Sequence, residues 1–264
     1  MKKVYVIPTL NCNLNCPHCE IHLRPDNFQH DLFFNELNKL SNEQLVLFGG
    51  EPLLRKERFY ECVETHTFDS ISTNLLLLNE EFINILKKKE ISISTSWNPK
   101  RFTDEQYKLW IDKLKLLQQH NMYCTILITL TEDLLQYDMN KFLQLIADWS
   151  SIGSVNGILF EPLLDYQMKK DLHERADKWL CDLYNVWDFP IINYTVEKLK
   201  HWNCDCSNVY TLYPNGELKK GCPQYEKQFV LPQCLQCEMV NKCRPCRLQH
   251  ICSFPKQLYK KVNK

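Results

Sequence analysis

Six short segments rich in apolar and β-branched residues alternate with amphipathic stretches over the first 195 residues. These strand candidates are residues 3–9, 44–50, 68–74, 90–96, 122–129 and 155–162. Strands that alternate with helices favour a parallel sheet joined by right-handed crossovers. Such a sheet can close into an incomplete (β/α) barrel or stay open as a doubly wound sheet. In both cases functional groups gather at the carboxyl ends of the strands.

The composition changes after about residue 196. Eight of the 14 cysteines lie between Cys204 and Cys252, and residues 211–220 form a hairpin pattern around an Asn-Gly turn. A segment this short has little core of its own and needs a metal centre to hold it together. We therefore predict a core domain over residues 1–196 and a cysteine-rich domain over residues 197–264.

Charge and hydropathy narrow the classes of partner. Lys plus Arg and Asp plus Glu number 32 each, so no overall positive field favours nucleic acid. The apolar run at residues 4–7 is too short for a signal peptide, and no later run reaches membrane length. We therefore expect a cytoplasmic protein with no nucleic-acid or membrane partner. In a reducing cytosol its cysteines are expected to be metal ligands rather than disulfides.

A triad of cysteines, Cys12, Cys16 and Cys19, follows the first predicted strand, with three and then two residues between them. Short spacings of this kind let a loop wrap a metal centre, and thiolates suit iron–sulfur clusters or zinc. Three thiolates leave a tetrahedral site incomplete. Either His18, His22 or a distant cysteine completes a zinc site, or a reactive molecule takes the open position.

The triad spacing, Cx3CxxC, resembles the signature of the radical S-adenosylmethionine (SAM) superfamily, with His18 at the family's aromatic-type position before the last cysteine. The resemblance implies that Cys12, Cys16 and Cys19 bind three irons of a [4Fe–4S] cluster. It also implies that the amino and carboxylate groups of SAM chelate the fourth iron. One electron from the cluster then cleaves the sulfonium to methionine and a 5′-deoxyadenosyl radical.

The ends of the next three predicted strands resemble further motifs of that family. FGGEPLL (48–54) resembles the GGEP motif, whose backbone meets the SAM amino group; ISTNLLL (71–77) resembles the TNG segment, with Leu75 replacing the glycine. ISISTSW (91–97) resembles the ribose-contacting strand, with Ser96 replacing the usual acidic residue. The alternative is an ordinary tight turn and polar groups that cap the following helices. The SAM contacts implied by the resemblance are His18, Gly49, Gly50, Glu51, Pro52, Thr73, Asn74 and Ser94.

The eight C-terminal cysteines are enough for two sites of four thiolates each. Their pattern resembles the SPASM extension of radical SAM maturases, with one extra residue before Cys222 and one fewer between Cys243 and Cys246. The resemblance covers residues 3–253 and implies two auxiliary [4Fe–4S] clusters; a single auxiliary cluster with a zinc ion is the alternative. The implied ligand sets are Cys204, Cys206, Cys222 and Cys246 for one cluster, and Cys234, Cys237, Cys243 and Cys252 for the other.

These resemblances imply an α/β fold: a partial (β/α)6 TIM-like radical SAM barrel with a small C-terminal SPASM-like domain. The implied enzyme, an oxidoreductase or maturase, abstracts hydrogen from a ribosomally made peptide to install a crosslink, thioether or epimerised centre. An external donor such as flavodoxin or ferredoxin supplies electrons. Because the chain starts at the first strand, we expect leader recognition by the barrel mouth, the cluster domain or a separate leader-peptide-binding protein.

The same sequence features are compatible with other functions. A radical SAM enzyme could act on a small molecule or on a sulfatase-type protein, although Pro223 stands where sulfatase maturases carry an aspartate base. A zinc-stabilised, non-enzymatic binding module is the alternative from another class.

Three cysteines, Cys62, Cys124 and Cys181, fit no cluster, and the default for such thiols is a buried apolar position. An epimerase would need a thiol as hydrogen-atom donor. However, the alternation over residues 122–129 predicts that Cys124 points away from the site. The residues predicted to face inward are Tyr123, Thr125, Leu127 and Thr129.

Overall fold

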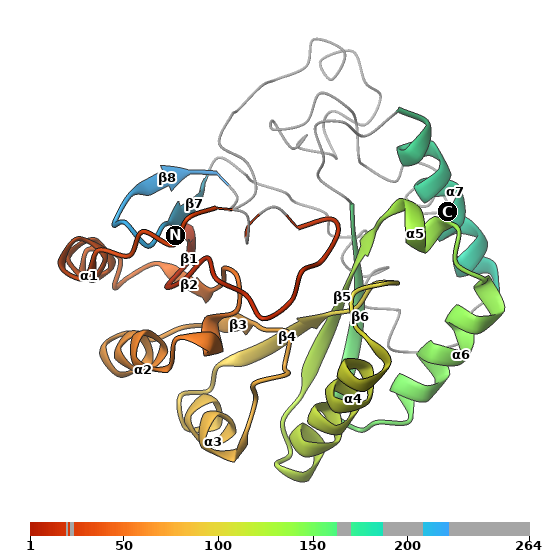
Figure 1. Cartoon of the computed structure of the whole chain (residues 1–264), viewed down its shortest axis with the longest axis horizontal. Helices are drawn as coiled ribbons and strands as arrows, with labels where there is room; N and C mark the ends of the chain where they lie inside the picture. The colour runs from red at the N-terminus through yellow and green to blue at the C-terminus, as the bar shows by residue number, and fades with distance from the viewer. Residues whose placement is uncertain (20, 22–23, 163–169, 187–207, 222–264) are drawn as a thin grey trace.

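The computed structural model describes residues 1–19, 21, 24–162, 170–186 and 208–221 (Figure 1). The strands are β1 (Lys3–Val6), β2 (Gln44–Leu47), β3 (Ser70–Ser72), β4 (Ser92–Ser96), β5 (Cys124–Leu130), β6 (Val155–Pro162), β7 (Val209–Leu212) and β8 (Leu218–Lys220). The helices are α1 (His30–Asn38), η2 (Pro52–Leu54, a 3-10 helix), α2 (Lys56–Thr65), α3 (Glu80–Lys88), α4 (Asp104–Gln119), α5 (Glu132–Leu135), α6 (Met139–Ser150) and α7 (Lys170–Val186). All six strands expected from the sequence are present.

The strands form one sheet in the order β6-β5-β4-β3-β2-β1-β7-β8. From β1 to β6 each strand pairs in parallel with the next strand along the chain, as the alternating pattern predicts. In Figure 1 the sheet follows an arc, and helices α1, α2, α3, α4 and α6 lie along its outer side. The carboxyl ends of β1 to β6 therefore share one edge of an incomplete barrel.

The hydrophobic core fills the space between the sheet and the outer helices. Strand β5 shows this clearly, because buried and partly exposed residues alternate along it. Cys124, Ile126 and Ile128 are wholly buried in the core, which confirms that Cys124 faces away from the inner side of the sheet. Cys62 in α2 is also wholly buried in the core, as expected for a thiol without a ligand role.

The inner face of the sheet is rich in hydroxyl groups. In the β3–β4–β5 register, Ser72 lies beside Ser94, and Ser94 beside Thr125. The Thr125 hydroxyl lies 3.2 Å from Asn156 Oδ1, next to an irregularity in the β5–β6 pairing. Tyr123, which was expected to face inward, precedes β5 and is 61% exposed.

The predicted hairpin on the Asn-Gly turn is confirmed, because β7 and β8 pair antiparallel. Strand β7 also pairs in parallel with β1, so the hairpin extends the same sheet. Gly216 in the turn has φ +80°, and a Cβ there would lie 2.7 Å from the Leu32 backbone in α1. The predicted boundary near residue 196 stays a prediction, but the sheet includes residues from both sides of it.

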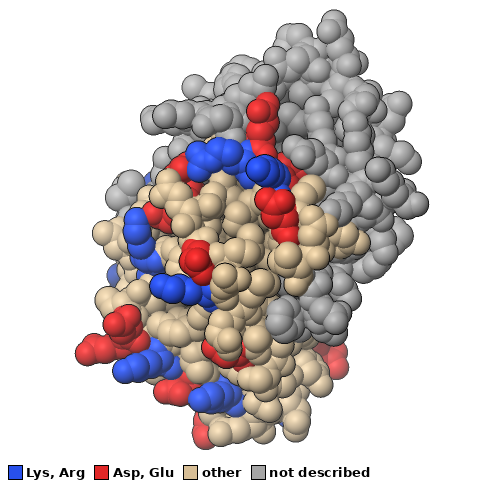
Figure 2. All heavy atoms as spheres, turned by 90° about the vertical axis from the view of Figure 1, so that its right-hand side faces the viewer, with Lys and Arg blue, Asp and Glu red and all other residues tan. Residues whose placement is uncertain are grey.

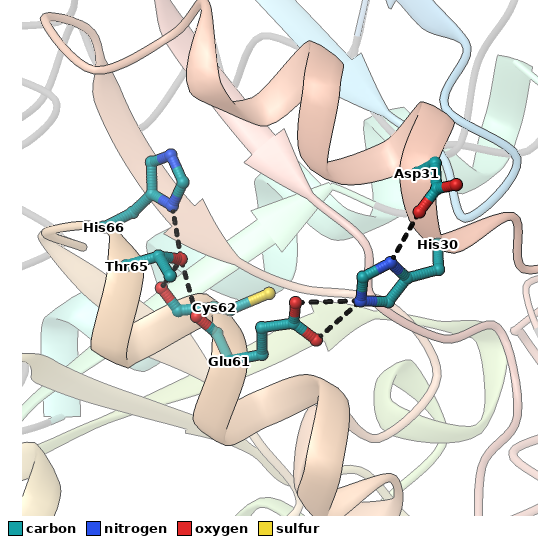
Figure 3. Close-up of polar contacts among 6 residues, drawn as sticks. All are labelled: His30, Asp31, Glu61, Cys62, Thr65 and His66. Carbon is teal, nitrogen blue, oxygen red and sulfur yellow. Dashed lines mark hydrogen bonds and ion pairs between the residues drawn. The ribbon is translucent and has the colours of Figure 1, made fainter.

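Helices α1 and α2 are linked at the surface through His30 (Figure 3). The His30 ring has Nε2 2.8 Å from Glu61 Oε1 and Nδ1 3.1 Å from Asp31 Oδ1. The hydrogen bond to Asp31, followed by that to Glu61, raises the pKa of His30 above its ordinary value. In the same view the Thr65 hydroxyl lies 2.8 Å from His66 Nδ1 at the end of α2.

Charged residues of both signs are interspersed over the described part of the surface in Figure 2. Among the described residues, no helix combines the length and the apolar character needed to cross a lipid bilayer. Several predicted ligands lie outside the described residues, and the assignments made to them stay predictions. They are His22, Cys204, Cys206, Cys222, Cys234, Cys237, Cys243, Cys246 and Cys252.

Candidate active site

The cysteine triad lies in the segment that follows β1 at the carboxyl edge of the sheet. We call residues 7–19 the cysteine loop and residues 49–52 the GGEP turn. The two segments are joined by backbone hydrogen bonds, with Gly50 N 3.0 Å from Thr9 O and Glu51 N 2.8 Å from Asn11 O. The GGEP turn therefore supports the loop that carries the thiols.

The glycines of the GGEP turn are needed for this close approach. Gly49 has φ +135°, and a Cβ there would lie 2.9 Å from the Ile7 side chain and closer still to the Thr9 carbonyl oxygen. A Cβ on Gly50 would lie 2.5 Å from the Leu10 oxygen and closer still to that of Asn11. No larger residue fits at Gly50 without moving the cysteine loop.

Asp26 fixes the first half of the cysteine loop. Its carboxylate accepts hydrogen bonds from the Thr9 hydroxyl at 2.9 Å, the Leu10 N–H at 3.0 Å and the Asn11 side chain at 3.2 Å. Arg58 Nη1 donates to the same carboxylate at 2.9 Å and belongs to helix α2. This mostly buried ion pair ties the loop to the helix that follows the GGEP turn.

Glu51 joins the ends of β2 and β3 through its carboxylate, which is wholly buried. Oε1 accepts hydrogen bonds from Leu53 N at 3.0 Å and from the Thr73 hydroxyl at 2.8 Å, and Oε2 accepts one from Asn74 N at 2.7 Å. Burial raises the pKa of Glu51, and the three donors oppose that shift. Both oxygens of the Glu51 carboxylate thus accept hydrogen bonds from groups of the protein itself. The next residue, Pro52, is the first residue of η2.

Asn74 connects the end of β3 to the cysteine loop. Its Nδ2 lies 2.6 Å from Asn13 Oδ1 and 3.8 Å from Cys12 Sγ. Leu75 next to it has φ +65°, although its side chain is wholly buried. The backbone therefore keeps a left-handed conformation that favours glycine, at the position where the resemblance expects glycine.

The Cys16 sulfur lies beside the cationic side chain of Arg101. Arg101, in the segment between β4 and α4, places Nη1 3.3 Å from Cys16 Sγ. Burial, and next the charge of Arg101, lower the pKa of His18 to about 4, so its ring is neutral at physiological pH. Cys19 is linked to Cys16 by a backbone hydrogen bond of 3.1 Å.

Hydrogen-bond donors point at two of the three sulfur atoms of the triad, those of Cys12 and Cys16. Leu14 N lies 3.4 Å from Cys12 Sγ, Asn74 Nδ2 also points at Cys12, and Arg101 points at Cys16. Burial is the main cause that raises the pKa of Cys12 and of Cys16, and Arg101 lowers both. Donors aimed at sulfur stabilise thiolates, so this environment fits an anionic iron–sulfur cluster.

The described residues contain no group of three or more His, Cys, Asp or Glu side chains placed to hold a single metal ion. A [4Fe–4S] cluster does not require that arrangement, because each cysteine binds a different iron. The triad thus has the ligand type and the donor environment that a cluster needs.

Ser94 lies beside the group formed by Glu51, Thr73 and Asn74. Its carbonyl accepts a hydrogen bond of 3.0 Å from Thr73 N, and its hydroxyl donates to the Ile71 carbonyl at 3.3 Å. The structure thus links most of the predicted SAM contacts to the cysteine loop through a short chain of hydrogen bonds.

Three charged residues of this site were not predicted from the sequence: Asp26, Arg58 and Arg101. Asp26 and Arg58 act through contacts with segments distant in the chain, and no local spacing marks them. For Arg101, its position just after a strand's carboxyl end was the available signal, because functional groups gather at that edge.

Fold and site together define an α/β protein with a thiol-bearing loop at the carboxyl edge of an incomplete barrel. The fold is shared with Streptococcus suis SuiB bound to S-adenosylmethionine, with a TM-score of 0.62 and 15% sequence identity over 91% of this chain and 71% of SuiB. SuiB bound to precursor peptide SuiA gives a TM-score of 0.62 at 14% identity over 91% of this chain and 70% of SuiB. The α/β fold class expected from the sequence is confirmed.

Sequence comparison adds one relative. An uncharacterized protein of Archaeoglobus fulgidus is 32% identical over 123 residues, which are 44% of this chain and 28% of that protein. The match thus spans less than a third of the relative. No protein-family model matches the sequence.

Proposed function

We propose that the protein is a radical SAM enzyme of the SPASM type that modifies a peptide. The observation that carries this proposal is the cysteine loop itself, which is joined to the GGEP turn through Gly50 and Glu51 and to the end of β3 through Asn74. The fold shared with SuiB supports it, since SuiB has been crystallised with SAM and with a precursor peptide.

Each group of the site has a distinct part in this proposal. A [4Fe–4S] cluster on Cys12, Cys16 and Cys19 would supply the electron that cleaves SAM. Gly49 and Gly50 let the GGEP backbone approach the cysteine loop. Glu51 holds the ends of β2 and β3 together through Thr73 and Asn74.

The remaining components are proposed on the sequence resemblance. They are two auxiliary [4Fe–4S] clusters on the eight C-terminal cysteines, an external donor such as flavodoxin or ferredoxin, and a cytoplasmic location. Auxiliary clusters with four thiolates each have no open iron, so they would transfer electrons or support the substrate site without binding it directly. A separate leader-peptide-binding protein is a further proposed partner.

Metal and sulfide analysis after strictly anaerobic purification and reconstitution tests this proposal. We expect about 12 irons per chain with matching sulfide, and about 8 in the Cys12→Ala/Cys16→Ala/Cys19→Ala variant. With dithionite, the unaltered protein should convert SAM to 5′-deoxyadenosine, and the triple variant should not.

Other results of that analysis have clear meanings. About 4 irons per chain together with zinc would keep the radical chemistry and remove both auxiliary clusters. Zinc without iron, and no cleavage of SAM, would refute the proposal and favour a zinc-stabilised binding module.

A further inference from the structure

Arg101 donates a hydrogen bond directly to a thiol of the triad, from Nη1 to Cys16 Sγ at 3.3 Å. It lies in the turn that follows β4, where Arg101 N bonds to Asn98 O at 3.2 Å. The Asn98 side chain anchors this turn to β5, because its Nδ2 lies 2.6 Å from Thr129 O and its Oδ1 lies 3.2 Å from Thr129 N. The backbone turn that carries Arg101 is therefore anchored to β5.

The charge of Arg101 has no direct anionic partner in the described part of the chain. Its Nε is buried without a hydrogen-bond partner there, and no described carboxylate forms an ion pair with it. The charge of Arg101 opposes the rise in the pKa of Glu51, but it does so without a direct contact. The Glu51 carboxylate accepts its hydrogen bonds from Leu53, Thr73 and Asn74. The Arg101 side chain is partly buried and lies against the Cys16 sulfur, so negative charge at the thiols would pair with its guanidinium.

We propose that Arg101 is a positioning residue for the triad cluster, which donates a hydrogen bond to the Cys16 sulfur and stabilises the reduced state of the cluster. This inference rests on the proposed function. Reduction adds one electron, supplied by a low-potential one-electron donor, and makes the cluster more negative. The guanidinium stays protonated throughout and takes up no proton. It therefore favours the reduced state and raises the reduction potential.

Two substitutions separate the charge of Arg101 from its geometry. Arg101→Met removes both the charge and the donor, whereas Arg101→Lys keeps the charge and loses the planar donor group. Lys108→Met is the matched control, because Lys108 is exposed on α4 and its loss changes the net charge equally. The signal of the triad cluster is the one missing from the Cys12→Ala/Cys16→Ala/Cys19→Ala chain.

The readout is a redox titration of that signal by electron paramagnetic resonance, together with iron per chain. For Arg101→Met we expect the equilibrium constant for reduction to fall about tenfold, which is about 59 mV more negative for a one-electron couple. Arg101→Lys should lie between the wild type and Arg101→Met, and Lys108→Met should match the wild type.

A potential for Arg101→Met equal to that of Lys108→Met, with equal iron, would overturn the inference and leave the proposed function intact. If Arg101→Met fails to retain iron, Arg101→Gln, which is neutral but keeps a donor, decides: a potential below that of Lys108→Met supports the inference, and an equal potential overturns it. A wild-type chain with no signal attributable to the triad would instead refute the proposed function, and the inference with it.

Discussion

Replacing Gly50 by alanine tests whether the contact between the GGEP turn and the cysteine loop organises the site. The added methyl group would lie 2.5 Å from Leu10 O and closer still to Asn11 O, whereas an ordinary carbon–oxygen contact is about 3.5 Å. Both obstructing atoms are backbone, so no side chain can rotate away. The loop must shift by roughly 1 Å or more relative to the turn.

The energetic consequence follows from that shift. Overpacking costs about 1–3 kcal/mol. The two hydrogen bonds that join the segments, Gly50 N to Thr9 O and Glu51 N to Asn11 O, contribute about 0.5–1.5 kcal/mol each. We therefore expect Gly50→Ala to lower the free energy of unfolding by about 2–6 kcal/mol. The iron content of the triad should fall with it.

Gly153→Ala provides the matched control for this experiment. The three atoms nearest to a Cβ on Gly153 all belong to the Gln118 side chain, the first its amide nitrogen at 3.0 Å, and that side chain can move. Urea denaturation followed by circular dichroism, together with iron per chain, measures both variants. If Gly50→Ala were as stable and as iron-rich as Gly153→Ala, the close approach would not organise the site.

Three further predictions address other features of the site and its surroundings. Asp26→Asn should lower the free energy of unfolding in urea denaturation by about 2–4 kcal/mol, because it breaks the mostly buried ion pair with Arg58. The control Asp112→Asn, on the exposed face of α4, should change that free energy by less than about 0.5 kcal/mol. Leu75→Ala should be less stable than Leu75→Gly by about 1 kcal/mol in the same assay, the reverse of the usual order, because φ is +65° there; equal stabilities would contradict this. The raised pKa of His30 contributes stability that is fully present below its unfolded value, about 6.5, and is lost as the pH rises through the folded value. His30→Gln should therefore lower the urea midpoint more at pH 5.5 than at pH 8.5, and an equal loss at both would contradict this.

The strands and the hairpin could be predicted because each depends on local sequence. The alternation along residues 122–129 set the two faces of β5, and the Asn-Gly pair set the turn between β7 and β8. The partner of β7 could not be predicted. Its parallel pairing with β1 joins residues more than 200 positions apart, and no local pattern encodes that contact.

The candidate site was predictable to a similar degree. Motif spacing located the triad and the GGEP turn, and it marked Leu75 as a departure from the expected glycine. The structure gives the physical meaning of that departure, since the left-handed backbone is kept while a buried leucine replaces the glycine. The spacing carried no information on Asp26, whose donors are three consecutive residues of the cysteine loop and Arg58 of α2.

The charged residues around the triad divide into two groups with separable effects. Asp26 and Glu51 accept hydrogen bonds from the chain's own donors, so they hold the cysteine loop and the ends of β2 and β3 in place. Arg101 instead donates to the Cys16 sulfur. Loss of Asp26 should therefore reduce how much iron the chain retains, whereas loss of Arg101 should change the potential of the iron that remains. A shared effect on both quantities would mean that the framework and the charge cannot be separated.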